Sequence, residues 1–429
     1  MLVRVKTFNN LKDSKDYIIN FLRKIETDES LYGVCSEIGK NIRKNGDTAL
    51  KKYLKDFDNF NLEFELEEES IKDSFSKVSK KFIDSIQKSI NRSRNFHKNS
   101  LPKSWNNSSG SLGENIIPVD KALCYVPGGT APLVSTVVMT VVPAKTAGVK
   151  EVIVTTPAIN NVISDEIVVA AKMAGADKIF LLGGAHSIFA FAYGTQTIPK
   201  VDLICGPGNK YVTEAKRQVF GSVGIDGLYG PTETLVIADK SNDIELCAAD
   251  LIAQAEHDVE ATPILITDSL EFSKKVEKEI FKQSESLSRK EVILKSFESK
   301  GLFFIVDNIV DSIELANLIA AEHVSILSEK VVNNYKSIIN AGGIFLGDDS
   351  AEVFGDYIAG PSHVMPTGGS ARFNSALNVR HFLKYQPFIN LSKKEVLSVI
   401  DEVINLAELE NLDGHAQSAF KRRRKMIGE

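Results

Sequence analysis

Several carboxamide, imidazole and carboxylate side chains occur at spacings that suit metal binding or proton transfer. Gln254 and His257 lie three residues apart on a predicted helix from Ile244 to His257, so both project from one helix face. This spacing suits two ligands of one metal ion. Taken alone, however, the pair is more typical of a solvated helix end that carries an ordinary histidine.

Two further segments place similar groups where chemistry often occurs. Glu322 and His323 close a predicted helix just before the predicted strand Val324–Leu327, at the edge of a sheet where acid–base groups often lie. Asp356 and His363 belong to an irregular, glycine-containing loop that is more polar than packing requires. These segments therefore supply candidate ligands and candidate acid–base groups.

His415 lies in a C-terminal tail that is too short to bury a core of its own and must dock on another surface. It can therefore deliver a ligand from a distance. A set of Gln, Asp and His ligands without a thiolate suits zinc with open coordination positions, or manganese, better than a closed structural site. A chain with 7 histidines needs no metal to explain them, so the spacing leaves both interpretations open.

Two glycine loops each follow a predicted strand and open a predicted helix, where free backbone N–H groups favour a phosphate. They are Tyr125-Val-Pro-Gly-Gly129 and Cys205-Gly-Pro-Gly-Asn209. Neither is G-x-G-x-x-G, and the next strand ends Val154-Thr-Thr-Pro157 without an acidic residue for a ribose hydroxyl. Taken alone, each loop is more typical of a tight turn.

Strands that alternate with helices must position these groups. Short β-rich runs separated by helical segments predict βαβ units on parallel sheets, in two series that indicate two α/β domains of similar build. The strands that we expect are Ala122–Val126, Glu151–Thr156, Lys178–Leu182 and Val201–Cys205, then Pro263–Thr267, Leu302–Val306, Val324–Leu327 and Gly343–Leu346.

The regions outside these two series differ in pattern. Apolar residues recur at helical spacing from Ile71 to Ile90 and predict one amphipathic helix in a mainly helical N-terminal region. The polar stretch Asn99–Glu114 is typical of a connecting loop near a domain boundary. From Ala376 onward we expect a helix, a short strand near Phe388 and a long helix from Ser392 through Ala407.

Composition excludes several classes of protein. A formal charge of -5 gives no general attraction to nucleic acid or to an anionic membrane. The basic run Lys421–Lys425 is more typical of a solvated helix end or a dimer contact than of a nucleic-acid patch. The 4 cysteines form no CxxC pair, so we expect neither disulfides nor a thiolate zinc site. We also expect no export signal and no membrane span, and therefore a cytoplasmic protein.

Taken together, the motifs resemble those of the histidinol dehydrogenase family from about Tyr125 to His415, with weaker likeness before Tyr125. The segments that carry the resemblance are Tyr125–Gly129, Gly206–Arg217, Gly230–Glu233, Gln254–His257, Ala321–His323, Gly355–Tyr357, Gly360–Gly369 and Glu410–His415.

The resemblance implies that L-histidinol is oxidised through histidinal to L-histidine, the last step of histidine biosynthesis, with two NAD and one water. It implies one Zn²⁺ per subunit in a homodimer with shared active sites. By motif position, the zinc ligands would be Gln254, His257, Asp356 and His415, which would also bind substrate. Glu322 and His323 would be the catalytic acid–base pair, and Thr232, His323, His363 and Glu410 would contact substrate. NAD would contact Tyr125, His186 and Asn209.

These roles agree with the chemistry. A neutral imidazole can accept the proton of a carbinol hydroxyl, so His323 is the candidate base of the first oxidation. Glu322 can activate the water that hydrates the aldehyde. Zinc would mainly orient the substrate.

The expected fold is of the α/β class, with two Rossmann-like parallel-sheet α/β domains, a helical N-terminal region and a small C-terminal dimerisation tail. Residues 1–22 would form an N-terminal arm. Residues 23–121 and 236–375 would form the first α/β domain, with the metal and acid–base residues. Residues 122–235 would form the second, NAD-binding domain, and residues 376–429 the tail.

Two departures from the usual family motifs bear on specificity. His186 stands where many members have glutamine, and Thr232 stands where many have serine. A relative that oxidises another small diol, such as a sulfopropanediol, is therefore one alternative, although the motif Gly360–His363 contains no Arg or Lys for a sulfonate. A non-catalytic zinc-binding or nucleotide-sensing relative is another, and the presence of Glu322 and His323 argues against it.

Overall fold

The computed structural model describes residues 5–22, 29–60, 63–128, 133–162 and 164–428. The chain divides into two compact units. The main unit comprises Met1–Ser100 and Val119–Phe382, and the tail unit comprises Leu101–Pro118 and Leu383–Glu429. No helix in the described ranges is both long and apolar enough to cross a membrane.

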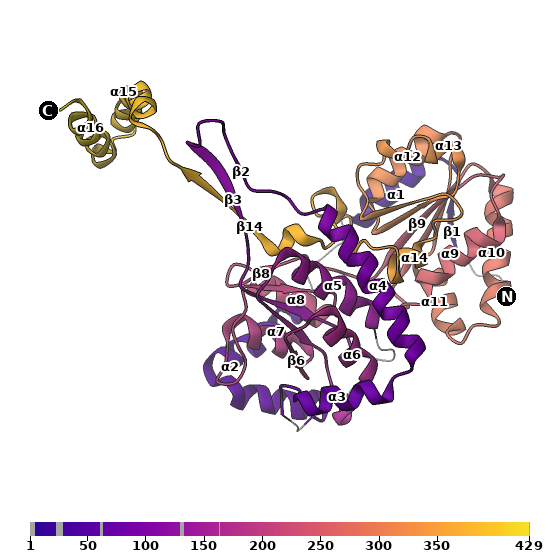
Figure 1. Cartoon of the computed structure of the whole chain (residues 1–429). Coiled ribbons are helices and arrows are strands. Elements are labelled where there is room, and N and C mark those ends of the chain that lie inside the picture. The colour runs from indigo at the N-terminus through magenta and orange to yellow at the C-terminus, as the bar shows by residue number, and fades with distance from the viewer. Residues whose placement is uncertain (1–4, 23–28, 61–62, 129–132, 163, 429) are drawn as a thin grey trace. The chain divides into compact units, whose positions relative to one another are not determined.

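The larger sheet of the main unit has six parallel strands in the order β1-β11-β10-β9-β12-β13. Figure 1 labels two of them, β1 and β9, with helices around them. These strands are β1 (Lys6–Phe8), β9 (Glu233–Ala238), β10 (Thr262–Thr267), β11 (Leu302–Ile305), β12 (His323–Ile326) and β13 (Gly343–Leu346). The expected strands from 263 to 346 are confirmed to within two residues, but the sequence pattern missed β1 and β9. The expected domain boundary at 235/236 passes through β9.

Helices cover both faces of this sheet because successive strand residues point to opposite faces. On β9, Val236 and Ala238 belong to one core cluster, and Leu235 and Ile237 belong to the other. The helices around the sheet are α1 (Leu11–Leu22), α9 (Ile244–Ala255), α10 (Leu270–Ser284), α11 (Lys290–Lys300), α12 (Ile309–Ile319), α13 (Glu329–Val332) and α14 (Glu352–Tyr357). Short 3-10 turns lie at η3 (Tyr335–Ser337), η4 (Ser370–Arg372) and η5 (Val379–Phe382).

The second sheet of the main unit has five parallel strands in the order β6-β5-β4-β7-β8. They are β4 (Lys121–Tyr125), β5 (Glu151–Thr155), β6 (Lys178–Phe180), β7 (Leu203–Cys205) and β8 (Gly224–Ile225). Its helices are α5 (Val134–Ala147), α6 (Asp165–Ala174), α7 (Gly184–Tyr193) and α8 (Lys210–Val219), with the short turn η2 (Ile159–Asn161). The expected parallel α/β build is therefore confirmed for both sheets.

The N-terminal helices are α2 (Glu29–Tyr53), the π-helical turn η1 (Leu54–Asp58), α3 (Glu68–Lys77) and α4 (Lys80–Asn99). The single helix expected from Ile71 to Ile90 is wrong: α3 ends at Lys77, and Ser79 caps a new helix by accepting a hydrogen bond from the Phe82 amide at 3.1 Å. Residues 35–64 share one core cluster with the five-stranded sheet. The expected division had grouped 23–121 with the other sheet instead.

The tail unit consists of an antiparallel sheet and two helices. Its sheet order is β14-β3-β2, with β2 (Trp105–Asn106), β3 (Leu112–Pro118) and β14 (Leu383–Ile389), and its helices are α15 (Lys393–Leu409) and α16 (Asp413–Ile427). The loop expected over Asn99–Glu114 is partly wrong, because β3 pairs with β14 over seven residues, from Leu112 opposite Ile389 to Pro118 opposite Leu383. The strand near Phe388 and the long helix after Ser392 are confirmed.

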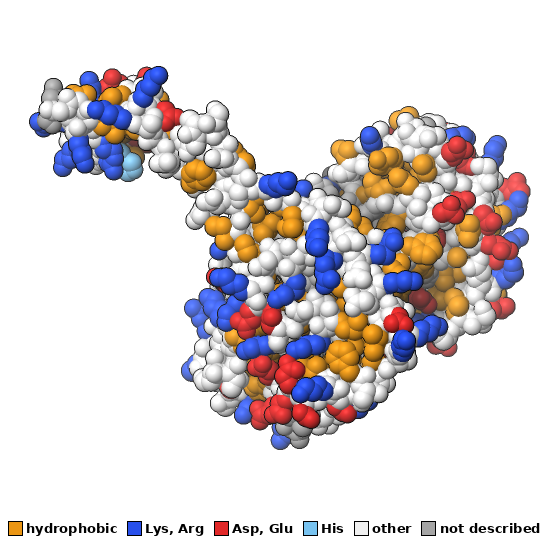
Figure 2. Space-filling view, viewed as in Figure 1, with side chains coloured by type: hydrophobic (Ala, Val, Ile, Leu, Met, Phe, Trp, Pro, Cys, Tyr) orange, Lys and Arg blue, Asp and Glu red, His pale blue; other side chains and the backbone are white. Residues whose placement is uncertain are grey.

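Basic side chains gather at the end of the tail unit, which Figure 2 shows in blue. They come from the run Lys421–Lys425 on α16, which is largely exposed to solvent. Arg423 lies 2.6 Å from Asp401 of α15. The run is exposed in the single chain, and its expected role as a solvated helix end or a dimer contact stays a prediction.

Candidate active site

The polar site residues gather where strands of the larger sheet begin. Thr232 immediately precedes β9, Glu322 immediately precedes β12, and His323 is the first residue of β12 and lies opposite Thr234. Because neighbouring parallel strands start at the same edge of a sheet, pairing alone brings these residues together. Sequence analysis placed Glu322 and His323 at a sheet edge, and the structure shows that this edge is the amino end of the strands.

A cavity of about 310 Å³ opens at this edge, facing loops that follow strands of the five-stranded sheet. Pro127 and the pair Pro207 and Gly208, from the loops after β4 and β7, form part of its wall. The predicted site residues that line it are Thr232, Gln254, His257, Glu322, His323, Asp356 and His363. The structure therefore brings seven residues from four sequence segments to one cavity.

Glu322 is a buried carboxyl group held by two donors. The Thr232 hydroxyl donates to its Oε2 atom at 2.7 Å, and the Glu233 amide donates to the same atom at 3.2 Å. Burial raises the pKa of Glu322 well above its usual value, and the nearby carboxyl groups of Glu233 and Asp356 add to this rise. A carboxylate with a raised pKa is a stronger base, which suits proton transfer near neutral pH.

His323 is almost fully buried with a neutral ring, because burial lowers its pKa to about 3. Its Nδ1 atom lies 3.3 Å from the backbone carbonyl oxygen of Glu233. A carbonyl can only accept a hydrogen bond, so this contact assigns the ring proton to Nδ1. Nε2 has no hydrogen-bond partner among the described residues. That nitrogen lies 3.8 Å from Asp356 Oδ1, and because His323 lines the cavity it is the candidate proton acceptor.

Glu352 is a residue of this site that sequence analysis missed. Its side chain is 0 % exposed and its Oε2 atom accepts a hydrogen bond from the Thr234 hydroxyl at 2.6 Å. Its other oxygen, Oε1, lies 3.5 Å from Nδ1 of His323. Burial raises the pKa of Glu352 well above its usual value, and a positive charge on the imidazole would favour the ionised form of this carboxyl. In the sequence it looks like an ordinary acidic residue in the first turn of a helix, so no local pattern distinguishes it.

The expected metal ligands of the main unit, Gln254, His257 and Asp356, line the same cavity. The Gln254 amide donates to Asp356 Oδ2 at 3.2 Å, and the Thr232 hydroxyl lies 3.0 Å from Gln254 Oε1. Burial raises the pKa of Asp356 to about 6. The neutral imidazoles of His323 and His363 lie 3.8 Å and 4.0 Å from its Oδ1 atom.

Gln254, His257 and Asp356 offer the kinds of donor atom that a zinc ion binds. These three side chains do not by themselves complete a zinc site. Imidazole, carboxylate and carboxamide oxygen are ligands that zinc accepts, and a bound cation would favour the ionised form of Asp356. Within the described ranges, no group of three or more His, Cys, Asp or Glu side chains is arranged to hold a metal.

His363 also reaches the cavity. Its Nδ1 atom lies 2.9 Å from the backbone carbonyl oxygen of Asp356, and its Nε2 atom lies 3.5 Å from the Thr136 hydroxyl. Burial lowers its pKa to about 4. The ring is therefore neutral, and it borders the same space as Glu322 and His323.

Comparison with known proteins gives the family. Residues 22–423 match the family model described as histidinol dehydrogenase. The histidinol dehydrogenase of Bacillus cereus is 42% identical over 395 residues, which cover 91% of this chain and 92% of that protein. The one of Clostridium acetobutylicum is 44% identical over 383 residues, with 88% and 89% covered. The crystal structure of histidinol dehydrogenase from Elizabethkingia anophelis matches with a TM-score of 0.92 at 31% identity, covering 99% of each chain.

The chain belongs to the histidinol dehydrogenase family. Membership makes it an oxidoreductase, an NAD-dependent dehydrogenase, and confirms the expected fold class.

In this family member, the residues expected to contact NAD follow three strands of the five-stranded sheet: Tyr125 ends β4, His186 lies in α7 after β6, and Asn209 follows β7. The buried Tyr125 hydroxyl accepts a hydrogen bond from the Gly184 amide at 3.2 Å, and Asn209 caps α8 by accepting from the amides of Tyr211 and Val212. His186 is buried, and its Nε2 atom lies 3.5 Å from Asp58. Its contact with NAD stays a prediction. Residues 129–132 of the first glycine loop lie outside the described ranges.

The two remaining residues implied by the family motifs, Glu410 and His415, lie in the tail unit. Glu410 is the C-terminal cap of α15, and His415 is in the first turn of α16. Both side chains are exposed. The four-ligand set that the family resemblance implies is therefore divided between two units of the chain.

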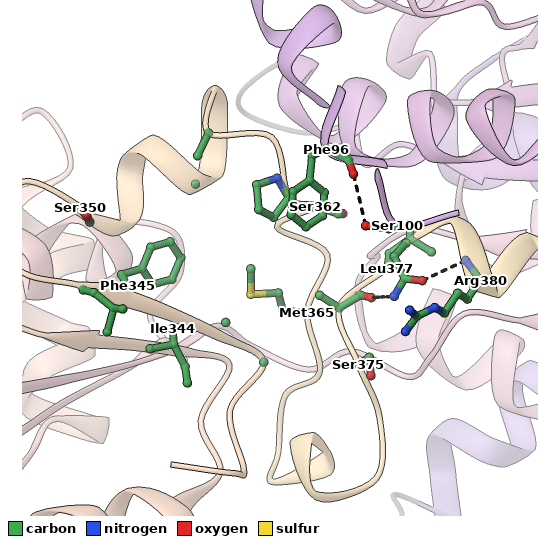
Figure 3. A pocket seen from close by; sticks show the side chains of 18 residues that line it. Phe96, Ser100, Ile344, Phe345, Ser350, Ser362, Met365, Ser375, Leu377 and Arg380 are labelled. Atoms are coloured by element: carbon green, nitrogen blue, oxygen red, sulfur yellow. Dashed lines mark hydrogen bonds between the residues drawn. The ribbon is translucent and has the colours of Figure 1, made fainter. Parts of the chain in front are cut away.

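A second and larger cavity, of about 610 Å³, shares Met365 with the active-site cavity. Figure 3 shows Met365 between Phe345 of the edge strand β13 and Leu377. Among the described residues that line it, Arg380 is the only charged one. Among the described lining residues of this larger cavity there is no histidine and no carboxylate, whereas the smaller cavity is lined by both.

Proposed function

We propose that the chain oxidises L-histidinol through histidinal to L-histidine, using two NAD and one water, as the last step of histidine biosynthesis. The observation that carries this proposal is the pair formed by a neutral His323 with a free Nε2 and a buried Glu322 in the same cavity. Two successive oxidations need a base for a hydroxyl proton and a base for water, and this pair supplies one of each.

In the first oxidation, Nε2 of His323 accepts the proton of the carbinol hydroxyl as the carbon loses its hydride. The resulting imidazolium is stabilised by Glu352, whose Oε1 atom lies 3.5 Å from Nδ1. In the second step, Glu322 accepts a proton from the water that adds to the aldehyde. Thr232 holds Glu322 in place through a hydrogen bond at 2.7 Å.

The acidic lining of the active-site cavity supports a cationic substrate. The cavity is lined by the carboxyl groups of Asp258, Glu322 and Asp356, and no Lys or Arg occurs among its described lining residues. An amino alcohol with an imidazole suits such a wall, whereas a sulfonate would be repelled.

The test of substrate is NADH formation by the purified, zinc-loaded protein. L-histidinol and dihydroxypropane sulfonate would be supplied in parallel, and we expect NADH with histidinol only. Two NADH per histidinol consumed would support the two-step reaction. If histidinol gives no NADH, the proposed function is wrong; NADH from the sulfonate alone would assign the chain to the other diol.

We further propose that Gln254, His257 and Asp356 hold one zinc ion per subunit, together with His415. When bound, zinc would orient the imidazole and amine nitrogens of the substrate and stabilise developing negative charge. Each of the four side chains offers a nitrogen or oxygen donor, which is the mixture that a catalytic zinc site uses.

Replacing His257 with alanine should remove most of the bound zinc, because the site loses one of its two nitrogen ligands. Metal analysis of the purified variant by mass spectrometry measures this directly, without reference to activity. Replacing His381 with alanine provides a control, since that histidine does not line the cavity. A His257→Ala protein that keeps one zinc per subunit would contradict the ligand assignment.

We also propose a cytoplasmic homodimer in which the tail of one subunit completes the site of the other. The tail unit presents apolar side chains that need a partner surface. Val403, Leu406 and Leu409 of α15 are 46%, 60% and 71% exposed, whereas Ile400 and Ala407 are buried. The exposed residues therefore leave an apolar surface uncovered in the single chain.

A further inference from the structure

Lys216 on α8 is a buried lysine that the proposed chemistry does not use. It is 1% exposed, and its ammonium lies 2.6 Å from Oδ1 of Asp226, whose side chain is 0% exposed. Lysine is almost never buried this completely without a partner. A buried pair contributes little net stability, because the loss of hydration offsets much of the attraction. Stabilisation of the fold therefore does not explain why this pair is buried, and its contacts indicate a role in the site.

The pair engages both backbone polar groups of Gly206, the first residue of the glycine loop Gly206–Asn209. The Lys216 ammonium donates to the Gly206 carbonyl at 2.8 Å, and the Gly206 amide donates to Asp226 Oδ2 at 2.8 Å. Gly206 has a φ of +108°, and a Cβ atom there would lie 2.2 Å from the Tyr125 carbonyl oxygen. The loop thus lies in close contact with the end of β4, and the ion pair holds Gly206, the residue at which the loop begins.

The same helix also holds a second part of the cavity wall. The Lys216 ammonium lies 4.8 Å from the centre of the Tyr229 ring, a distance at which a cation is attracted to an aromatic face. The Thr213 hydroxyl, one turn earlier on α8, donates to the Tyr229 carbonyl at 2.8 Å. Pro207, Gly208 and Tyr229 all line the active-site cavity. One buried cation therefore ties together two segments of that wall.

We propose that Lys216 and Asp226 are positioning residues that hold the loop Gly206–Asn209 and Tyr229 in the shape that binds NAD. This inference rests on the proposed function, in which Asn209 contacts NAD. A loop that is already ordered pays less conformational entropy when a ligand binds, so loosening it weakens binding. The pair makes none of the hydrogen bonds that hold Glu322 and His323, so their proton transfers should be spared.

The experiment replaces both members of the pair, Lys216→Met with Asp226→Asn, so that no unpaired charge is left buried. Binding of NADH is followed by its fluorescence. We expect the Kd for NADH and the KM for NAD to rise at least about tenfold, since two charge-assisted hydrogen bonds to the loop are lost. Zinc content, the KM for histidinol and kcat at saturating NAD should change by less than about twofold.

The matched control is the same pair of substitutions at a surface ion pair, Lys145→Met with Asp177→Asn. Those two side chains are 2.9 Å apart and 30% and 40% exposed. This variant should bind NADH like the wild type, because an exposed pair contributes little.

Three outcomes would overturn the inference. A folded Lys216→Met, Asp226→Asn protein that binds NADH as tightly as the wild type would show that the pair does not position the loop. A lowered Tm with parallel losses of zinc, histidinol and NADH affinity would show a general structural role instead. If the wild-type protein binds neither NAD nor NADH, the proposed cofactor is wrong, and the inference about the loop is wrong as well.

Discussion

Replacing His323 with asparagine should lower kcat by about a hundredfold or more, which is the usual loss when a general base is removed. The reason is geometric: Nε2 of this buried, neutral ring is a proton acceptor on the cavity wall, and it has no partner among the described residues. Asparagine can still donate to the Glu233 carbonyl, which the wild-type Nδ1 approaches at 3.3 Å. Steady-state kinetics with matched zinc content and Tm would measure the effect.

Two variants separate the loss of a base from other effects. Glu352→Gln keeps the hydrogen bond from Thr234 but removes the ionisable carboxyl group beside Nδ1. Its kcat should fall about tenfold or more, because a carboxyl group that can ionise favours a protonated imidazole more than a neutral amide does. His363→Asn alters a neighbouring imidazole of the cavity and should mainly raise the KM for substrate. Wild-type kcat in a folded, zinc-loaded His323→Asn protein would exclude His323 as the base.

Activity should reappear when two inactive proteins, His415→Ala and His257→Ala, exchange subunits. If each tail completes the site of the partner, a mixed dimer holds one site with both lesions and one intact site. Random exchange puts half of the subunits in mixed dimers, so recovery should reach about one quarter of wild-type activity. The exposed positions of Glu410 and His415, and the exposed apolar residues of α15, support this arrangement.

The exchange experiment needs proof that mixed dimers form. Subunits with different affinity tags allow mixed dimers to be purified and their NADH formation measured. A second mixture, His257→Ala with Asp356→Ala, is the matched negative control, because both lesions lie in the main unit and no intact site can form. Purified mixed dimers of His415→Ala and His257→Ala without activity would show that the tail serves its own subunit.

Local sequence patterns and family motifs predicted many of the strands and many of the residues that line the cavity. Apolar β-rich runs predicted the strands that precede the two glycine loops, because a strand buried on both faces is apolar along its length. The family motifs identified Thr232, Gln254, Glu322, His323 and Asp356, and the structure brings all five to one cavity. These residues were within reach of sequence analysis because each belongs to a family motif that is present in this sequence.

Only the tertiary structure decided the features that depend on long-range pairing. The stretch around Gly113 looked like a loop because it is polar, yet it is a strand since Gly113 pairs with Phe388, far along the chain. Sequence analysis assigned residues 23–121 to the domain that contains residues 236–375, whereas in the structure residues such as Leu50 and Phe60 pack in the core of the five-stranded sheet.

The same reason explains the site residues that sequence analysis did not find. Glu352 and Lys216 are charged residues on helices, and such residues are normally solvated. Their roles come from burial beside His323 and beside Asp226, respectively. Burial removes the water that would otherwise screen a charge, so a residue with no distinctive local pattern acquires a strong interaction with one specific partner. Hydrophobic periodicity reports which face of a helix is buried, but only the folded chain determines what lies against that face.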